Sequence, residues 1–192
     1  MPKQHNSREE NRQIKAGQTP PEWQERPNKR SQKDTDARWT KKNGISYYGF
    51  KNHINVDVKY GFIRQYEVTD ASVHDSQVLG AVLDEDNSSA KIWADSAYRS
   101  ELIQQVLALM GFKSQIHERG YRNRPLTGRQ KQKNRTRSRT RAKVEHVFGT
   151  IVNEMGGKLL RSIGLKRAAG NLGLMNLTYN LKRLVMWEAK KQ

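Results

Sequence analysis

The chain has 192 residues, of which 34% are hydrophobic and 29% charged, enough for one domain plus a tail or for two very small domains. Its formal net charge of +17 predicts binding to polyanions, because each Lys or Arg that neutralises a phosphate releases condensed counterions. Charge alone leaves open a structural RNA-binding protein.

The absence of cysteine excludes disulfides and thiolate zinc sites. No apolar run approaches the roughly 20 residues that span a bilayer, and the N-terminus lacks the apolar stretch of a secretory signal, so we expect a cytoplasmic protein without a membrane partner.

Residues 1–44 are polar and carry no sustained apolar period. The middle of this segment, TPPEWQERPNKRSQKD, holds three prolines and many charges. It therefore predicts an extended arm or linker, or a loop with one short helix. Trp23 and Trp39 suggest that parts of this arm dock against other residues. Residues 45–192 are expected to form the folded core.

Alternating apolar residues predict a β-hairpin over residues 47–69, with its turn at Lys59-Tyr60-Gly61. Helical and strand patterns then follow one another along the chain. They predict a helix over 75–85, a buried strand over 90–95, a helix over 100–110 that begins after Ser100, and a strand over 112–118. This order is typical of the mixed α/β class.

The last third of the chain begins with a basic segment, residues 119–143, which contains eleven Lys or Arg and no acidic residue. Such a segment suits contacts to DNA phosphates, which position a protein without reading sequence, and the alternative is a solvated, disordered loop. An apolar stripe predicts a helix from about Arg139 to Met155. A broader apolar face predicts a final helix over 167–188.

Two carboxylates are candidates for chemistry. Asp95 ends the apolar strand AKIWAD, at the rim of a sheet where open α/β folds place ligands, although an Asp that caps a turn is the competing interpretation. Glu145 follows the basic segment and lies beside the apolar stripe, where a carboxylate needs a cation. Its competing interpretation is an exposed ion pair with Arg141, worth about 0.2–0.5 kcal/mol. Carboxylates from different elements suit Mg²⁺, and two such ions about 3.5–4 Å apart catalyse phosphodiester chemistry.

Three blocks in this order resemble the DDE transposases of bacterial insertion sequences, and among them the insertion-sequence-five family: DTDARWTKKNGISYYGFKNHINVDVKYGFIRQYEVTDASVHDSQVL, WADSAYRS and RAKVEHVFGTI. The resemblance implies an RNase H-like fold of the retroviral-integrase type, with a mixed sheet and flanking helices. It implies cleavage and strand transfer at insertion-sequence ends with Mg²⁺ or Mn²⁺. Asp95 then matches the second acid of a three-carboxylate site, Glu145 the third, and Arg141 the arginine of the family signature.

The resemblance and the charge pattern together suggest a set of basic residues that contact DNA. These are Lys133, Arg135, Arg137, Arg139, Arg141, Lys143 and Lys158. Two signature positions differ from the family, since Ser138 replaces a Tyr and Val152 replaces a Lys. The expected partners are DNA and either further copies of the chain or a full-length transposase.

The first acid of the family lies on the first core strand, before the polar arm. No apolar strand precedes residues 1–44, so we expect that strand and its Asp to be missing and the chain to be a truncated copy. Asp57 is a conceivable substitute, but an exposed, alternating position explains it more simply. The alternative function is a non-catalytic remnant that binds DNA and cannot cut it.

Overall fold

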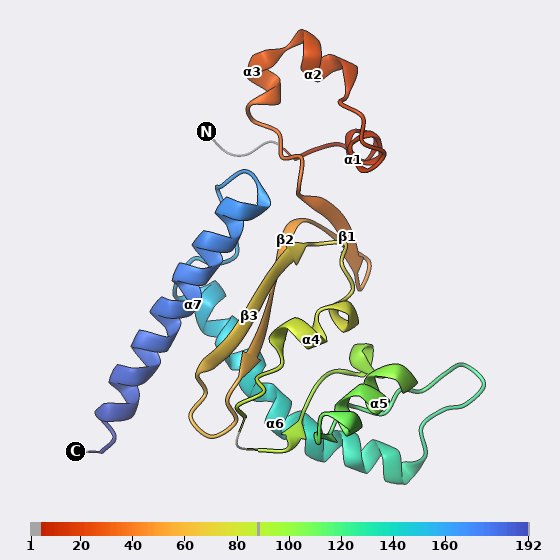
Figure 1. Cartoon of the computed structure of the whole chain (residues 1–192), viewed down its shortest axis with the longest axis vertical. Helices are drawn as coiled ribbons and strands as arrows, with labels where there is room; N and C mark the ends of the chain where they lie inside the picture. Colours follow the sequence, from red (N-terminus) through yellow and green to blue (C-terminus); the bar gives the residue numbers. More distant parts are fainter. Residues whose placement is uncertain (1–4, 88, 192) are drawn as a thin grey trace.

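The computed structural model describes residues 5–87 and 89–191. Within these residues, a three-stranded antiparallel sheet and a two-stranded parallel sheet are flanked by helices (Figure 1). This arrangement confirms the mixed α/β class. In the same residues, none of the helices has the length and apolar character that a membrane span requires.

The predicted arm contains three short helices, α1 (Arg8–Lys15), α2 (Pro21–Glu25) and α3 (Pro27–Arg30), where an extended arm or a loop with one short helix was expected. A capping box between Ser7 and Glu10 begins α1. Trp23 is only 1% exposed, and its indole N–H donates a hydrogen bond of 2.7 Å to Glu10 Oε1. The expectation of an extended arm was wrong because one buried tryptophan fixes helices that are too short to show an apolar period.

A long strand, β2 (Ile45–Val56), is the central strand of the three-stranded sheet. Its first half pairs with β1 (Arg38–Lys42), which also lies in the predicted arm, and its second half pairs with β3 (Ile63–Asp70). The predicted hairpin is thus confirmed. Asp57 lies in the β2–β3 turn, where its carboxylate accepts hydrogen bonds from the backbone N–H groups of Lys59 and Tyr60. It therefore serves as a half-buried turn residue, and not as the exposed, alternating strand position that was expected.

The chain continues into the 3-10 turn η1 (Asp75–Gln77) and a single helical turn, α4 (Leu79–Val82), instead of a helix over 75–85. Asn55 Nδ2, on β2, donates to Val82 O at 2.9 Å and so satisfies one of the last carbonyl groups of this short helix. The next residue, Leu83, is already extended.

The two-stranded sheet pairs β4 (Lys91–Ile92) with β5 (Lys113–Ser114) in parallel, and α5 (Glu101–Leu109) connects them. Both strands are shorter than the predicted 90–95 and 112–118. The backbone hydrogen bonds nevertheless extend further, because Gln115 N donates to Ile92 O at 2.7 Å and His117 N donates to Ala94 O at 3.1 Å. The ladder thus reaches the residue before Asp95.

The long helix α6 (Gly128–Asn153) begins well before the expected Arg139. A capping box between Thr127 and Gln130 begins it, and Lys, Arg and Gln are good helix formers even without an apolar face. The Asn134 side chain bonds both backbone groups of Glu118, at 2.8 and 3.0 Å, which ties this half of α6 to the segment after β5. From residue 128 onward the basic segment is therefore a helix and not a disordered loop.

Two apolar clusters form the core. One joins the β2–β3 hairpin to α6 and α7 (Leu165–Glu188) and consists of Val56, Ile63, Val147, Ile151 and Tyr179. The other joins α4, β4, α5 and the segment after β5 and consists of Leu79, Ile92, Leu107 and Ile116. The middle of α6 lies between these clusters, beside the end of β4.

The N-terminus of α7 is capped by two aspartates from far upstream. Gly164 has a φ of 90° and brings no capping side chain of its own. Its N–H donates to Asp34 Oδ2 at 3.1 Å, and the N–H of Leu165 donates to Asp36 Oδ2 at 2.8 Å. Negative charge is favourable at this end of a helix. The N-terminal segment is thereby attached to the last helix.

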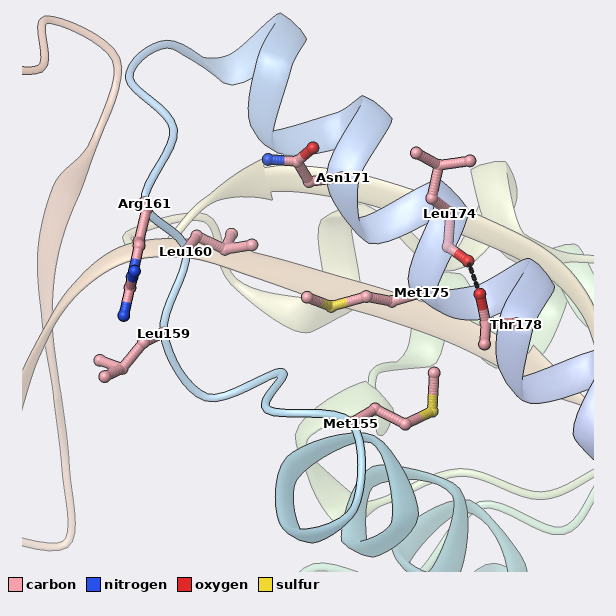
Figure 2. A pocket seen from close by; sticks show the side chains of 8 residues that line it. All are labelled: Met155, Leu159, Leu160, Arg161, Asn171, Leu174, Met175 and Thr178. Carbon is pink, nitrogen blue, oxygen red and sulfur yellow. Dashed lines mark hydrogen bonds between the residues drawn. The ribbon is translucent and has the colours of Figure 1, made fainter.

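Figure 2 shows a hollow between the α6–α7 connection and one side of α7. It is lined by Met155, Leu159, Leu160, Arg161, Asn171, Leu174, Met175 and Thr178. None of these residues carries a carboxylate, so this hollow is separate from the candidate site described next.

Candidate active site

Asp95 follows the parallel ladder directly and caps the 3-10 turn η2 (Ser96–Tyr98). Its carboxylate accepts hydrogen bonds from both the backbone N–H and the hydroxyl of Ser96. Asp95 is therefore a capping residue, as the competing structural interpretation of this aspartate expects. The side chain is still 51% exposed, so its second oxygen remains available to other partners.

Glu145 lies on α6 with its side chain 60% exposed. Arg141 Nη2 is 2.6 Å from Glu145 Oε1, which is the ion pair of the competing interpretation. The same guanidinium also contacts the first carboxylate, because Arg141 Nη1 lies 3.5 Å from Asp95 Oδ2. Asp95 and Glu145, far apart in sequence, thus meet at one positive charge.

The surroundings of Asp95 favour its ionised form. Burial acts to raise the pKa of Asp95, but the Ser96 N–H bond and the positive charge of Arg141 outweigh it, so the pKa is lowered. Burial and the charge of Arg141 lower the pKa of His117, against the opposing effect of Asp95. His117 is therefore a neutral imidazole at neutral pH, next to an ionised carboxylate.

Tyr98 is a further group at this site that sequence reasoning missed. Burial and the carboxylates of Asp75 and Asp95 raise the pKa of Tyr98 to about 12. Asp75 is itself paired with Lys51 Nζ at 3.1 Å. Groups with shifted pKa values gather at functional sites. Tyr98 and Asp75 both lie in sequence blocks that carry the family resemblance, but nothing in those blocks singled them out. For His117, the one usable signal was its position at the end of the strand predicted to pair with that of Asp95.

The predicted DNA-contacting residues fall into two groups. Arg137 donates to Ile116 O at 2.7 Å and lies 3.4 Å from Glu118 Oε1, and its side chain is only 13% exposed. Arg141 is engaged with the two carboxylates. The other five, Lys133, Arg135, Arg139, Lys143 and Lys158, are exposed.

Four exposed basic residues recur at every fourth position of α6 and so follow one side of the helix. This cationic row consists of Lys131, Arg135, Arg139 and Lys143. Sequence reasoning missed Lys131, because it did not place the start of the helix early enough.

Asp95 and Glu145 provide the hard oxygen ligands that Mg²⁺ prefers, and Mg²⁺ keeps several waters besides its protein ligands. Their meeting at one guanidinium shows that the fold brings both carboxylates to a single positive charge. Within residues 5–87 and 89–191, no group of three or more His, Asp or Glu is placed to hold a metal. Asp95 and Glu145 alone would thus supply only part of the ligand set of a divalent cation.

Comparison with known proteins identifies the family of this chain. Residues 12–181 match the family described as the transposase DDE domain. The chain is also similar to the transposase for insertion sequence element IS1106 of Neisseria meningitidis serogroup B, with 33% identity over 149 residues, which are 78% of this chain and 51% of the relative. The chain thus spans about half the length of that relative. The search of solved structures found no match. Because the matched region covers most of its length, the chain belongs to the family of transposase DDE domains.

Proposed function

We propose that this chain takes part in DNA cleavage and strand transfer at insertion-sequence ends, with Asp95 and Glu145 as two of the metal-binding carboxylates. One observation carries the proposal. These two carboxylates, one from the segment after β4 and one from α6, meet at the same guanidinium, although either one alone has a purely structural explanation. Family membership gives the reaction class.

Each group then has a chemical task. Mg²⁺ or Mn²⁺, when bound, would activate the attacking oxygen and stabilise the leaving oxyanion. Asp95 is ionised well below neutral pH and is ready to bind a cation. His117, neutral and near Asp95, accepts a proton without first having to lose one. Arg141 presents a planar fork of donors suited to a phosphate.

An RNase H-like fold is the finer part of this proposal, with a further strand between β2 and β4 that carries the first acid of the three-carboxylate site. Two strand edges support it. Among the described residues, β1 pairs with β2 only up to Gly49, so beyond that point β2 has a strand partner on the β3 side alone. In the same residues, β4 has only β5 as its neighbour.

The proposed DNA path follows the cationic row on α6. Lys131, Arg135, Arg139 and Lys143 would hold a DNA backbone along one side of α6, whereas Glu145, two residues after Lys143, faces away from that lysine together with Arg141. Arg137 is excluded from this path, because it holds α6 to Glu118.

Nicking of a duplex that carries the element's own ends tests the catalytic proposal. We expect nicking by the chain with Mg²⁺, no nicking with EDTA, and loss of nicking in Glu145→Gln. Glu154→Gln is the matched control, since Glu154 ends the same helix and pairs with Lys182 instead. Equal nicking by Glu145→Gln and Glu154→Gln would show that the site assignment is wrong.

DNA binding without cleavage is the second candidate. It is favoured by the cationic row and by the finding that, among the described residues, Asp95 and Glu145 have no third ligand placed to complete a metal site. It predicts salt-sensitive DNA binding that does not respond to Mg²⁺, and no nicking. Fluorescence anisotropy at several salt concentrations measures this binding. Arg135→Gln and Arg139→Gln should each reduce the slope of log K against log salt by about 0.9, whereas Arg137→Gln should leave it unchanged. An unchanged slope in all three variants would remove α6 from the DNA path.

A further inference from the structure

We infer that Arg141 is an internal counterion that competes with divalent cations for Asp95 and Glu145, and that it leaves the two carboxylates when such a cation binds. This inference rests on the proposed function, because it assumes that the two carboxylates bind metal. It adds a regulated exchange of one cation for another at that site.

The position of the guanidinium is the first argument. Its two terminal nitrogens face different carboxylates, with Nη2 at 2.6 Å from Glu145 Oε1 and Nη1 at 3.5 Å from Asp95 Oδ2. A single positive charge therefore lies between two negative ones. This is the place where a divalent cation shared by both side chains would be most favourable.

The second argument is that little else holds Arg141 there. Its Nε is buried and, among the described residues, has no hydrogen-bond partner. Arg137, one turn earlier, is held differently, because it bonds a backbone carbonyl, Ile116 O, as well as Glu118. Arg141 depends on the two carboxylates, so a competing cation that takes them removes its known ion-pair partners.

The consequence is an exchange of charge. A bound divalent cation repels the guanidinium, and a guanidinium released from carboxylates is well suited to bind a phosphate through two parallel hydrogen bonds. Without metal, Arg141 neutralises the acids. With metal, it becomes available to DNA. Removing its charge must therefore strengthen metal binding, whereas a residue that merely orients the carboxylates would weaken metal binding when lost.

The experiment measures Mn²⁺ binding by electron paramagnetic resonance of the free ion, with no DNA present. Arg141→Gln is compared with Arg139→Gln, which removes the same charge from an exposed position on the same helix. We expect Arg141→Gln to bind Mn²⁺ about tenfold more tightly than Arg139→Gln, because the positive charge that competes with Mn²⁺ for the carboxylates has been removed. Arg141→Lys keeps the charge and should stay closer to the wild type than Arg141→Gln does.

A second readout needs no variant. On titration with Mg²⁺, the NMR signal of the Arg141 Nε–H group should shift, while that of Arg137 should not. Equal or weaker Mn²⁺ binding by Arg141→Gln than by Arg139→Gln would overturn the inference and leave the proposed metal site intact. Absence of Mn²⁺ binding in the wild type and in every variant would overturn both.

Discussion

Asp34 makes the attachment of the N-terminal segment to α7 directly testable. It is fully buried, and its carboxylate accepts three backbone hydrogen bonds, from Asp36 N at 2.9 Å, Ala37 N at 3.0 Å and Gly164 N at 3.1 Å. The first two close a local turn, and the third fixes the start of α7. Asp34→Ala removes all three at once.

The size of the effect follows from these contacts. A hydrogen bond to a charged group contributes about 1.5–3 kcal/mol, and such values do not add fully when one residue makes several bonds. Loss of a helix cap costs about 0.5–2 kcal/mol. We therefore expect Asp34→Ala to lower the free energy of unfolding by about 3–5 kcal/mol, a large part of the 5–15 kcal/mol that is typical of a domain. Asp36→Ala removes one exposed cap and should cost only about 1 kcal/mol.

Urea unfolding followed by circular dichroism measures the difference. With a slope of about 2–3 kcal/mol per molar urea, the midpoint of Asp34→Ala should fall by roughly 1–2 M. Asp34→Asn keeps one oxygen acceptor and should lie between Asp34→Ala and the wild type. If Asp34→Ala lost no more stability than Asp36→Ala, the buried carboxylate would not be the main attachment of this segment.

Three further predictions concern the second cluster and the site. Ile116→Ala should lower the free energy of unfolding by about 2–5 kcal/mol, because the side chain is fully buried; a loss below 1 kcal/mol in urea unfolding would contradict this. Carboxyl ¹³C NMR should show that Asp95 titrates below its ordinary pKa of 3.8, and Arg141→Gln should raise the pKa of Asp95. The stability gained from ionised Asp95 is present above pH 3.8 and is lost as the pH falls through the pKa that Asp95 has in the folded protein. Tyrosinate absorbance should show that Tyr98 titrates near pH 12, and Asp95→Asn should lower the pKa of Tyr98. The stability linked to neutral Tyr98 is fully present below pH 10.0, its ordinary pKa, and is lost as the pH rises towards 12. An ordinary pKa for Tyr98 would mean that it is not buried beside carboxylates.

Local patterns were enough for the elements that local interactions define. The alternation after Tyr47 located the hairpin, Ser100 marked the start of α5, and the apolar run before Asp95 placed that residue at the end of the parallel ladder. In each case a period or a cap is written in consecutive residues. Whether Asp95 and Glu145 act as metal ligands stays a prediction.

Long-range contacts explain what local patterns missed. The helices of the N-terminal segment depend on the burial of Trp23 and on the contact from Asp34 to Gly164. The early start of α6 depends on polar contacts to Glu118. Arg137 looked like any other basic residue until the fold showed its partner. Arg141 was expected to pair with one acid, and only the tertiary structure shows that it pairs with two.

The continuity of α6 has a mechanical consequence for the site. The helix is about 39 Å long at 1.5 Å per residue, and its two halves are anchored to different cores, at Glu118 and at Val147. A bend of about 10° near Arg137 would move Glu145, some 12 Å further along, by roughly 2 Å. Such a shift is comparable to the difference between a cation held by both acids and a cation held by one. The curvature of this helix therefore affects the spacing of the two carboxylates.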